Sequence, residues 1–175
     1  TSPKMVEKET QVRMIGYGGM LMESFVAIMA LAAAVSLSPG IYFSMNTSTA
    51  TMNKLAGPET VAAAPCKTTN DPEHHCEKLA EAAVAKLGVT DAQGRKPTPE
   101  WDSWDDQGNP KTYTGAEALE RLASDVGEPN VVSRTGGAPT LSVGIAHILH
   151  QIGGGRAMMG FWYHFAIMFE ALFIL

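Results

Sequence analysis

The sequence has little cysteine, few basic residues and no secretory leader. Its 175 residues include 2 Cys and 13 Lys and Arg, and the basic residues are scattered along the chain. A nucleic-acid-binding protein concentrates positive charge on one face or helix, so a nucleic-acid partner is excluded. The chain starts at Thr1, without an initiator Met or a basic segment leading into an apolar stretch and a cleavage site. We therefore expect an internal fragment of a larger protein.

Charge is distributed unevenly along the chain. Residues 42–134 contain nine Lys and Arg and fourteen Asp and Glu, which accounts for the whole net charge of −5. The two ends are electrically balanced and strongly apolar. This contrast predicts a polar middle, residues 39–135, between two ends that lie in a lipid bilayer.

Two apolar segments are candidates for crossing the bilayer. Met14–Leu37 has one ionisable residue in 24, and a bilayer core takes about 20 helical residues. The second segment, GFWYHFAIMFEALFIL, is still apolar where the chain stops and has a Trp-Tyr pair near its start, which suits a headgroup region. We predict transmembrane helices at 14–38 and, truncated, at 157–175. The alternative is that both are core helices of a soluble all-α protein, but a core helix this long without a polar face is unusual.

Glu23 is the ionisable residue inside the first apolar segment. It shares a helical face with small residues spaced three or four positions apart: Gly16, Gly19, Ala27, Ala30 and Ala34. Small residues let helices pack closely in lipid, so this face predicts contact with the remaining helices of a full-length protein. Glu23 either loads and releases a coupling proton or forms a hydrogen bond between helices, and both alternatives stay open.

The second apolar segment contains His164 and Glu170. Glu170 shares a helical face with Tyr163, Ala166 and Ile174, whereas His164 projects about 120° away at 3.6 residues per turn. The two residues therefore do not form one dyad, and each is a candidate for a substrate or ion pathway shared with helices outside this fragment. A structural role is favoured for His164, which lies beside the aromatic residues of the membrane interface.

A glycine-rich stretch, GGAPTLSVGIAHILHQIGGG, separates the polar middle from the second apolar segment. Its apolar part, Leu141–Ile152, is too short to cross a bilayer. One alternative is a re-entrant segment whose Gly-Gly-Ala-Pro backbone lines a cavity at membrane depth. The other is a loop followed by an amphipathic helix at the interface. The sequence supports the two alternatives equally over residues 136–156.

The polar middle carries signals for two short helices. An Asp-Pro start and a stop at Gly88 predict a helix over residues 72–87. Thr114 and Glu117 form a capping-box pattern, and Gly127 closes the helix that follows it.

Between these helices, residues 94–113 (GRKPTPEWDSWDDQGNPKTY) are expected to be irregular. Turn-forming and acidic residues dominate this part of the chain. Trp101 and Trp104 within it are interpreted as local packing anchors rather than as a binding platform.

The two cysteines, Cys66 and Cys76, are separated by nine residues, with His74 and His75 beside the second. Zinc prefers four tetrahedral ligands, commonly with closely spaced cysteine pairs, and adjacent His residues project about 100° apart on a helix. A metal site is therefore not favoured, and no cofactor is expected. A disulfide that closes a short loop is favoured if this loop faces an oxidising compartment.

The basic residues of the polar segment 1–13 indicate an orientation. Lys4, Lys8 and Arg13 precede the first apolar helix, and the next basic residue after it is Lys54. Cytoplasmic flanks of transmembrane helices carry an excess of Lys and Arg. This end is therefore predicted to be cytoplasmic, and the acidic middle extracytoplasmic.

Five blocks of the sequence are long and specific: TSPKM at Thr1–Met5, IGYGGMLMESFVAIMALAAA at Ile15–Ala34, PGIYFSMN at Pro39–Asn46, GGAPTLSVGIAHI at Gly136–Ile148 and MGFWYHFAIMFEALFIL at Met159–Leu175. They closely resemble the carbon starvation protein A family of multi-pass carriers in the bacterial inner membrane, which are associated with peptide uptake and proton-coupled pyruvate uptake. The resemblance covers both ends and fades across the acidic middle.

The resemblance implies a carrier rather than an enzyme, mainly α-helical and related to the amino acid–polyamine–organocation carriers with their inverted repeats. In such folds substrate and coupling ions bind near the midplane at broken helices. Thr1, Ser2 and Lys4 match a family stretch of small polar residues at such a break and join the pathway candidates.

Two functions from different classes are compared. The first is a fragment of a secondary transporter for peptides or small carboxylates such as pyruvate, coupled to a proton and linked to the carbon-starvation response. The alternative is a membrane-anchored extracytoplasmic module whose acidic loop binds a partner or a metal. Intramembrane Glu residues that face a helix bundle favour the transporter, whereas a folded loop with a bound metal would favour the module.

Overall fold

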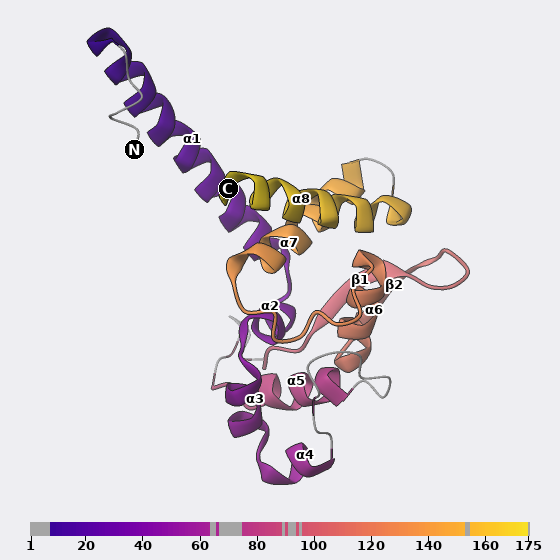
Figure 1. Ribbon diagram of the computed structural model, residues 1–175. Helices are drawn as coiled ribbons and strands as arrows, with labels where there is room; N and C mark the ends of the chain where they lie inside the picture. The colour runs from indigo at the N-terminus through magenta and orange to yellow at the C-terminus, as the bar shows by residue number, and fades with distance from the viewer. Residues whose placement is uncertain are drawn as a thin grey trace. The chain divides into compact units, whose positions relative to one another are not determined.

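The computed structural model describes residues 8–63, 66, 75–88, 90, 94, 96–152 and 155–174. Within these residues the chain is mainly helical, as predicted, with one two-stranded sheet (Figure 1). It divides into two compact units, residues 1–32 and 33–175. The two units are described separately.

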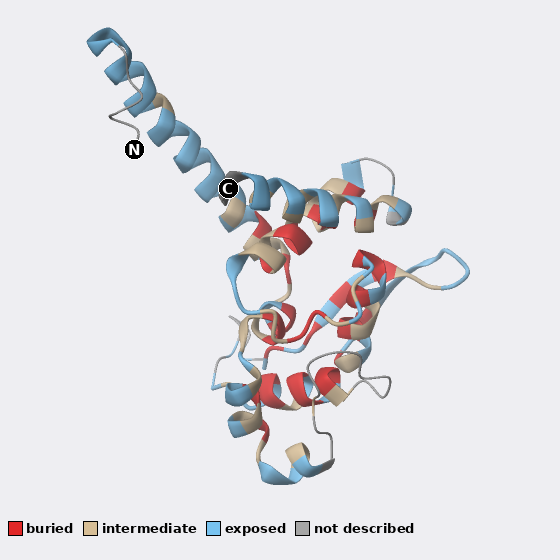
Figure 2. Ribbon diagram, viewed as in Figure 1, coloured by how far each residue is buried: buried red, intermediate tan, exposed pale blue. Residues whose placement is uncertain are grey.

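The first unit consists of most of helix α1, Glu9–Ser36, which begins inside the segment predicted to be polar. Its large apolar side chains are exposed along the whole length (Figure 2), and only 6% of its most apolar stretch is buried. Among the described residues, α1 is the one helix with the length and composition to cross a membrane. Its exposure argues against the core helix of a soluble protein, because soluble domains bury such surfaces.

Three short helices follow in the second unit, where the sequence predicted a loop. They are α2 (Pro39–Asn46), α3 (Thr49–Ala56) and α4 (Pro58–Ala63). Ser38 and Ser48 are the N-caps of the first two, and each hydroxyl accepts a hydrogen bond from the backbone N–H three residues on, at 3.4 and 3.3 Å. The sequence analysis predicted two helices in the polar middle and did not single out these two serine caps.

Helix α5, His75–Ala85, agrees with the described part of the helix predicted over residues 72–87. The proposed start at Asp71 and Pro72 lies outside the described residues. Leu79, Ala83 and Val84 are buried, so one face of α5 packs into the core.

The stretch predicted to be irregular contains a β-hairpin instead. Strands β1 (Glu100–Trp104) and β2 (Pro110–Thr114) pair antiparallel, with Trp101 opposite Tyr113. The side chain of Asp105 holds the turn, because its Oδ1 accepts hydrogen bonds from the N–H groups of Gln107 and Asn109 at 2.9 and 2.8 Å. The turn-forming residues therefore mark the tip of a hairpin, and the alternation of buried and exposed positions in β1 marks a strand.

Helix α6, Ala116–Val126, ends at Gly127 as predicted, in the left-handed conformation with φ 76°. The predicted capping box is wrong, since Thr114 belongs to β2 and the N-cap is Gly115, which has no side chain to cap with. The N–H of Ala116 instead donates to Glu81 Oε2 of α5 at 3.1 Å. The carboxylate of Glu81, 35 residues away in the sequence, therefore takes the place of a side-chain N-cap at the start of α6.

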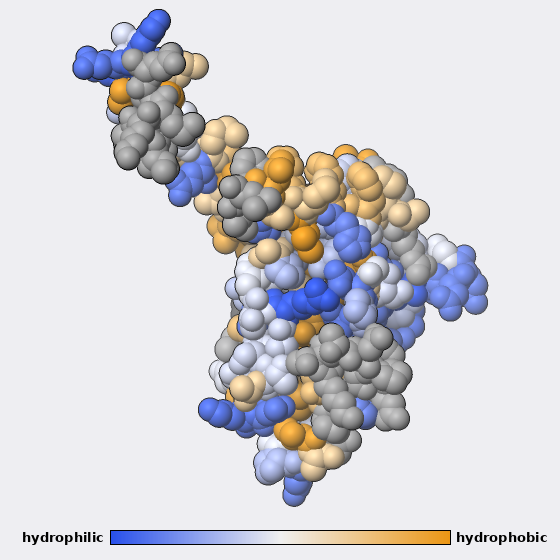
Figure 3. All heavy atoms as spheres, in the orientation of Figure 1, coloured by the Kyte–Doolittle hydropathy of each residue, from blue (hydrophilic) through white to orange (hydrophobic). Residues whose placement is uncertain are grey.

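The unit ends with helix α7 (Gly137–Ile152), a 3₁₀ turn, η2 (Arg156–Met158), and helix α8 (Met159–Ile174). The helices α7 and α8 pack against each other, and Figure 3 shows hydrophobic side chains over α8. Gly137 and the following Ala-Pro already belong to α7. Three of the four residues of Gly-Gly-Ala-Pro are therefore helical, and the alternatives of a re-entrant and an interfacial segment stay open.

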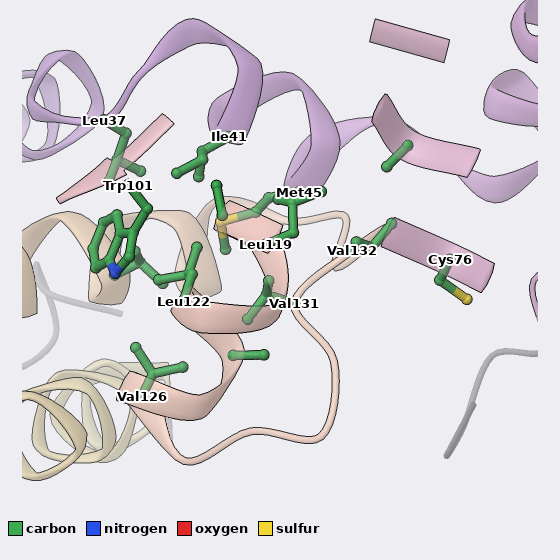
Figure 4. Packing of buried hydrophobic residues seen from close by; sticks show 14 of the residues in the cluster. Leu37, Ile41, Met45, Cys76, Trp101, Leu119, Leu122, Val126, Val131 and Val132 are labelled. Atoms are coloured by element: carbon green, nitrogen blue, oxygen red, sulfur yellow. The ribbon is translucent and has the colours of Figure 1, made fainter. Parts of the chain in front are cut away.

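The core of the second unit joins α2, α5, α6, α7, α8 and the hairpin. Ile41 and Met45 of α2 meet Leu119 of α6, and Trp101 lies beside Leu37 (Figure 4). Trp101 is 2% exposed, which confirms its interpretation as a packing anchor. The polar middle is thus a folded module that shares its core with α7 and α8.

Candidate functional site

Glu23 lies in the first unit on an exposed face of α1. At Gly16 and Gly19 on the same face, a Cβ atom would meet nothing within 4 Å. This small-residue face is exposed from Gly16 to Ala27 and half-buried at Ala30 and Ala34, so its exposed part is available for close packing by another helix.

His164 lies where α8 crosses the end of α6. Its Nε2 atom lies 3.6 Å from the position that a Cβ would take at Gly127, and one turn earlier a Cβ at Gly160 would lie 3.5 Å from the carbonyl oxygen of Val126. The last carbonyls of a helix favour a nearby imidazole. This position supports the structural interpretation of His164.

Glu170 is half-buried on the same face of α8 as Tyr163, whose side chain is fully buried. Its Oε2 atom and the Oγ atom of Ser142 on α7 are both buried and have no hydrogen-bond partner among the described residues. A buried polar atom without a partner is costly. Both atoms are therefore available to groups supplied from outside this part of the chain.

The remaining predicted residues lie elsewhere. Thr1, Ser2 and Lys4 are outside the described residues. Cys66 and Cys76 are joined by a disulfide with a Cα–Cα distance of 4.5 Å, which links the segment after α4 to the first turn of α5. Among the residues that the structure describes, no group of three or more His, Cys, Asp or Glu side chains is placed to hold a metal ion.

Asp125 is a buried carboxylate that fastens the hairpin to α6. Its Oδ2 accepts hydrogen bonds from Trp101 Nε1 at 3.0 Å and from Ser103 Oγ at 2.5 Å, and its Oδ1 lies 3.4 Å from Arg121 Nε. Arg121 also donates to the carbonyl oxygen of Trp104. These charge-assisted contacts fix the hairpin to the helix.

On its other side the hairpin meets two histidines of α7. The ring centroids of Trp101 and His147 are 4.8 Å apart, and those of Trp104 and His150 are 5.4 Å apart. The two imidazoles are themselves 5.4 Å apart. Burial lowers the pKa of His147 below its usual 6.5, and the neighbouring His150 lowers it further, whereas Asp102 opposes the shift. His147 is therefore neutral at pH 7.

A small pocket opens beside this histidine pair. It has a volume of about 170 Å³ and lies between the end of α1, the hairpin and α7. Glu100, Asp102 and His147 contribute its ionisable groups, and Trp101 forms part of its wall. The pocket is smaller than the roughly 300–1,000 Å³ of typical small-molecule sites, so it suits a small group of a larger ligand.

Residues 1–98 and 102–175 match the family model described as "Carbon starvation protein CstA". The chain belongs to the CstA family. It is 43% identical over 175 residues to the "Peptide transporter CstA" of Escherichia coli K12 and 44% identical over 175 residues to the "Pyruvate/proton symporter BtsT" of the same strain. It is also 27% identical to the "Peptide transporter CstA" of Bacillus subtilis.

Each of these matches covers 100% of the chain but only 19–21% of the relative, so the chain spans about a fifth of the length of the curated relatives it matches. No solved structure matches it. The family model, apart from residues 99–101, and the CstA-family relatives extend across the acidic middle, where the sequence analysis found the resemblance to fade.

The analysis of the sequence did not single out His147, His150 or Asp125 in this CstA-family chain. His147 and His150 are three residues apart and therefore share one face of α7. This spacing could have identified the pair from the sequence. Their aromatic partners lie on a hairpin that the sequence analysis took for irregular chain, so the pairing could not be predicted.

Proposed function

We propose that the chain is part of a secondary transporter that takes up peptides or small carboxylates such as pyruvate, coupled to protons. The observation that carries this proposal is the match of the entire chain, at 43% and 44% identity, to a peptide transporter and to a pyruvate/proton symporter. The two identities are nearly equal and so support both substrate classes. A role as an enzyme is not proposed, since these relatives are transporters.

The protein is proposed to cross the bacterial inner membrane several times. The exposed apolar side chains of α1 and α8 support this arrangement, with α1 and α8 as transmembrane helices and the module between them outside the cytoplasm. The Cys66–Cys76 disulfide supports an extracytoplasmic module, because disulfides persist in oxidising compartments. Glu23 and Glu170 are proposed as ion-pathway residues, and Thr1, Ser2 and Lys4 as part of a broken helix.

The alternative function, a membrane-anchored binding module, is not favoured. The middle of the chain is folded, as that alternative required, but the same residues match transporters from end to end. The folded module is therefore assigned to the transporter itself.

Uptake by the full-length protein tests the proposal. Vesicles or cells that contain it should accumulate labelled pyruvate or labelled dipeptides above the level of cells that lack it, and a proton uncoupler should abolish accumulation. Accumulation that continues after the proton gradient is removed would contradict proton coupling, and the absence of uptake of both substrates would contradict transport.

A further inference from the structure

We propose that Ser142 of α7 is the hydrogen-bond partner that positions the exchangeable proton of Glu170 on α8. The inference rests on the proposed proton-coupled transport, in which Glu170 is an ion-pathway residue. Ser142 acts through Glu170 and is therefore a positioning residue. Two observations support this role: the two side chains stand at the same level of facing helices, and each has a buried oxygen atom without a partner.

Helices α7 and α8 run antiparallel. They pack against each other and are joined by residues 153–158 (Figure 1), and a short connection makes neighbouring helices antiparallel. Ser142 lies ten residues before the end of α7 at Ile152, and Glu170 lies eleven residues after the start of α8 at Met159. At a rise of about 1.5 Å per residue, both lie about 15–17 Å from the connected ends. Ser142 and Glu170 are therefore at the same level of the helix pair.

Ser142 lies on the side of α7 that α8 covers. The other elements that contact α7 meet its opposite side, where Thr140 accepts a hydrogen bond from α2, Gly144 lies against the end of α1 and His147 contacts β1. Ser142 projects about 140–160° away from these three residues, at about 100° per residue. It is nevertheless fully buried. Its burial therefore comes from α8, which packs against α7.

Glu170 lies on the buried face of α8. It shares this face with Met159 and Tyr163, eleven and seven residues earlier, and both of these side chains are fully buried. Within the described part of the chain, no Lys or Arg forms an ion pair with Glu170. An ionised carboxylate away from water is costly unless it is paired or hydrogen-bonded. The ionised form of Glu170 therefore needs a hydrogen-bond donor nearby.

The hydroxyl of Ser142 is suited to be that donor. Ser24 and Ser44 each donate to the carbonyl oxygen four residues earlier in their own helix, at 2.8 Å. Ser142 Oγ makes no such bond, and it is buried without a partner among the described residues, as is Glu170 Oε2. A buried polar atom of this kind calls for an explanation, and a bond formed between the two by side-chain rotation supplies one.

One hydroxyl can serve both protonation states of Glu170. It donates a hydrogen bond to the ionised carboxylate and accepts one from the protonated carboxyl group. Ser142 keeps its own proton in both states, and the proton that is bound and released belongs to Glu170.

Uptake by the full-length protein as a function of external pH tests the inference. A hydrogen bond stabilises an ionised carboxylate more than a protonated one, so Ser142→Ala should make proton release harder and raise the pH of half-maximal uptake by about one unit. Ser142→Thr retains the hydroxyl and should retain the midpoint of the parent protein. Ser44→Ala is the matched control, because Ser44 is equally buried but its hydroxyl is bonded within α2.

An unchanged midpoint in Ser142→Ala would overturn the inference. An equal shift in Ser142→Thr or in Ser44→Ala would also overturn it, because the shift would then not come from the hydroxyl that faces Glu170.

The pairing of the two positions is tested without transport. In the full-length protein that carries Ser142→Cys and Glu170→Cys, a short bifunctional methanethiosulfonate should join the two cysteines. Ser142→Cys with Leu172→Cys is the control pair, because Leu172 lies on an exposed face of α8. Equal yields from the two pairs would overturn the inference, even if Ser142→Ala does not reach the membrane.

These measurements separate the inference from the proposed function. A parent protein that takes up neither dipeptides nor pyruvate contradicts the proposed function. A parent protein with proton-dependent uptake whose pH midpoint does not respond to Ser142→Ala contradicts the role of Ser142 alone.

Discussion

At the scale of single residues, Asp125 is the buried carboxylate that holds the hairpin against α6. Its carboxylate joins two side chains of β1 to Arg121 of α6 away from water. The side chain of Arg121 is only 13% exposed. Removing either Asp125 or Arg121 therefore leaves the other charge in a place that water cannot easily reach.

Asp125→Ala should lower the free energy of unfolding of the module by about 3–5 kcal/mol, because it leaves the largely buried guanidinium of Arg121 with only the exposed carboxylate of Asp106, at 3.7 Å. The measurement is the amide hydrogen exchange of β1 and α6 in the full-length protein. Glu117→Ala is the matched control, since its ion pair with Lys111 is exposed and is worth about 0–1 kcal/mol. Equal effects of the two substitutions would contradict the role given to Asp125.

Glu23→Gln distinguishes the two proposals for the carboxylate in α1. Glutamine keeps the size and much of the hydrogen bonding of a protonated glutamate but does not titrate. If Glu23 carries the coupling proton, the variant should reach the membrane at normal levels and lose concentrative uptake. Uptake that keeps its normal dependence on external pH would leave Glu23 with a structural role, and Glu170→Gln would then be the next variant to measure.

The contact between the hairpin and α7 should weaken as the pH falls. The pKa of His147 is lower in the folded protein than its usual 6.5, so the folded state favours the neutral imidazole. This contribution to stability is fully present above about pH 6.5 and is lost as the pH falls through the lowered pKa. Amide exchange of β1, corrected for its intrinsic pH dependence, should rise between pH 7.5 and 5. In the His147→Phe variant, this increase in the exchange rate of β1 at low pH should disappear. An increase that persists in the variant would show that another titrating group is responsible.

At the scale of elements, local patterns predicted α5, the end of α6 and the two apolar helices. The hairpin was missed because its acidic and turn-forming residues were read as irregular chain, although Asp105 and Gly108 mark its turn. The start of α6 was misplaced for another reason. Its cap is Glu81, which is 35 residues away in the sequence, and no local motif indicates such a partner.

The close approach of α7 to the last turn of α1 depends on Gly144. A Cβ at this position would lie 2.7 Å from Ala33 C and 2.8 Å from Ala33 Cβ, so the backbone of one helix must move. Gly144→Ala should therefore destabilise this contact by about 1–3 kcal/mol. Gly137→Ala in the same helix is the control, because its Cβ would meet nothing within 4 Å. Equal melting temperatures of the Gly144→Ala and Gly137→Ala variants would contradict this packing.

At the scale of the whole molecule, composition alone predicted the membrane-associated ends and the polar middle. The candidate pathway residues could be nominated from the sequence but not assembled into a site, since the chain covers only 19–21% of the length of its relatives. The small pocket beside the histidine pair could not be predicted for a different reason, because its walls come from three separate parts of the chain.

The orientation of the module is open to a direct measurement. A cysteine introduced at Asn109, in the exposed hairpin turn, should react with a membrane-impermeant maleimide in intact cells if the module is extracytoplasmic. The parent protein is the control, because it shows any labelling that does not come from position 109, and Cys66 and Cys76 are joined in the disulfide. Reaction only after the cells are lysed would reverse the proposed orientation.

The cap that α5 provides for α6 sets an order of events during biogenesis. The disulfide anchors the first turn of α5, and Glu81, five residues after Cys76, accepts the hydrogen bond at the start of α6. If the module is exported as proposed, its cysteines meet an oxidant only after translocation. The final packing of α5 against α6 is then delayed until this part of the chain has left the cytoplasm. Until then the chain stays in an incompletely folded form that can pass through the export machinery.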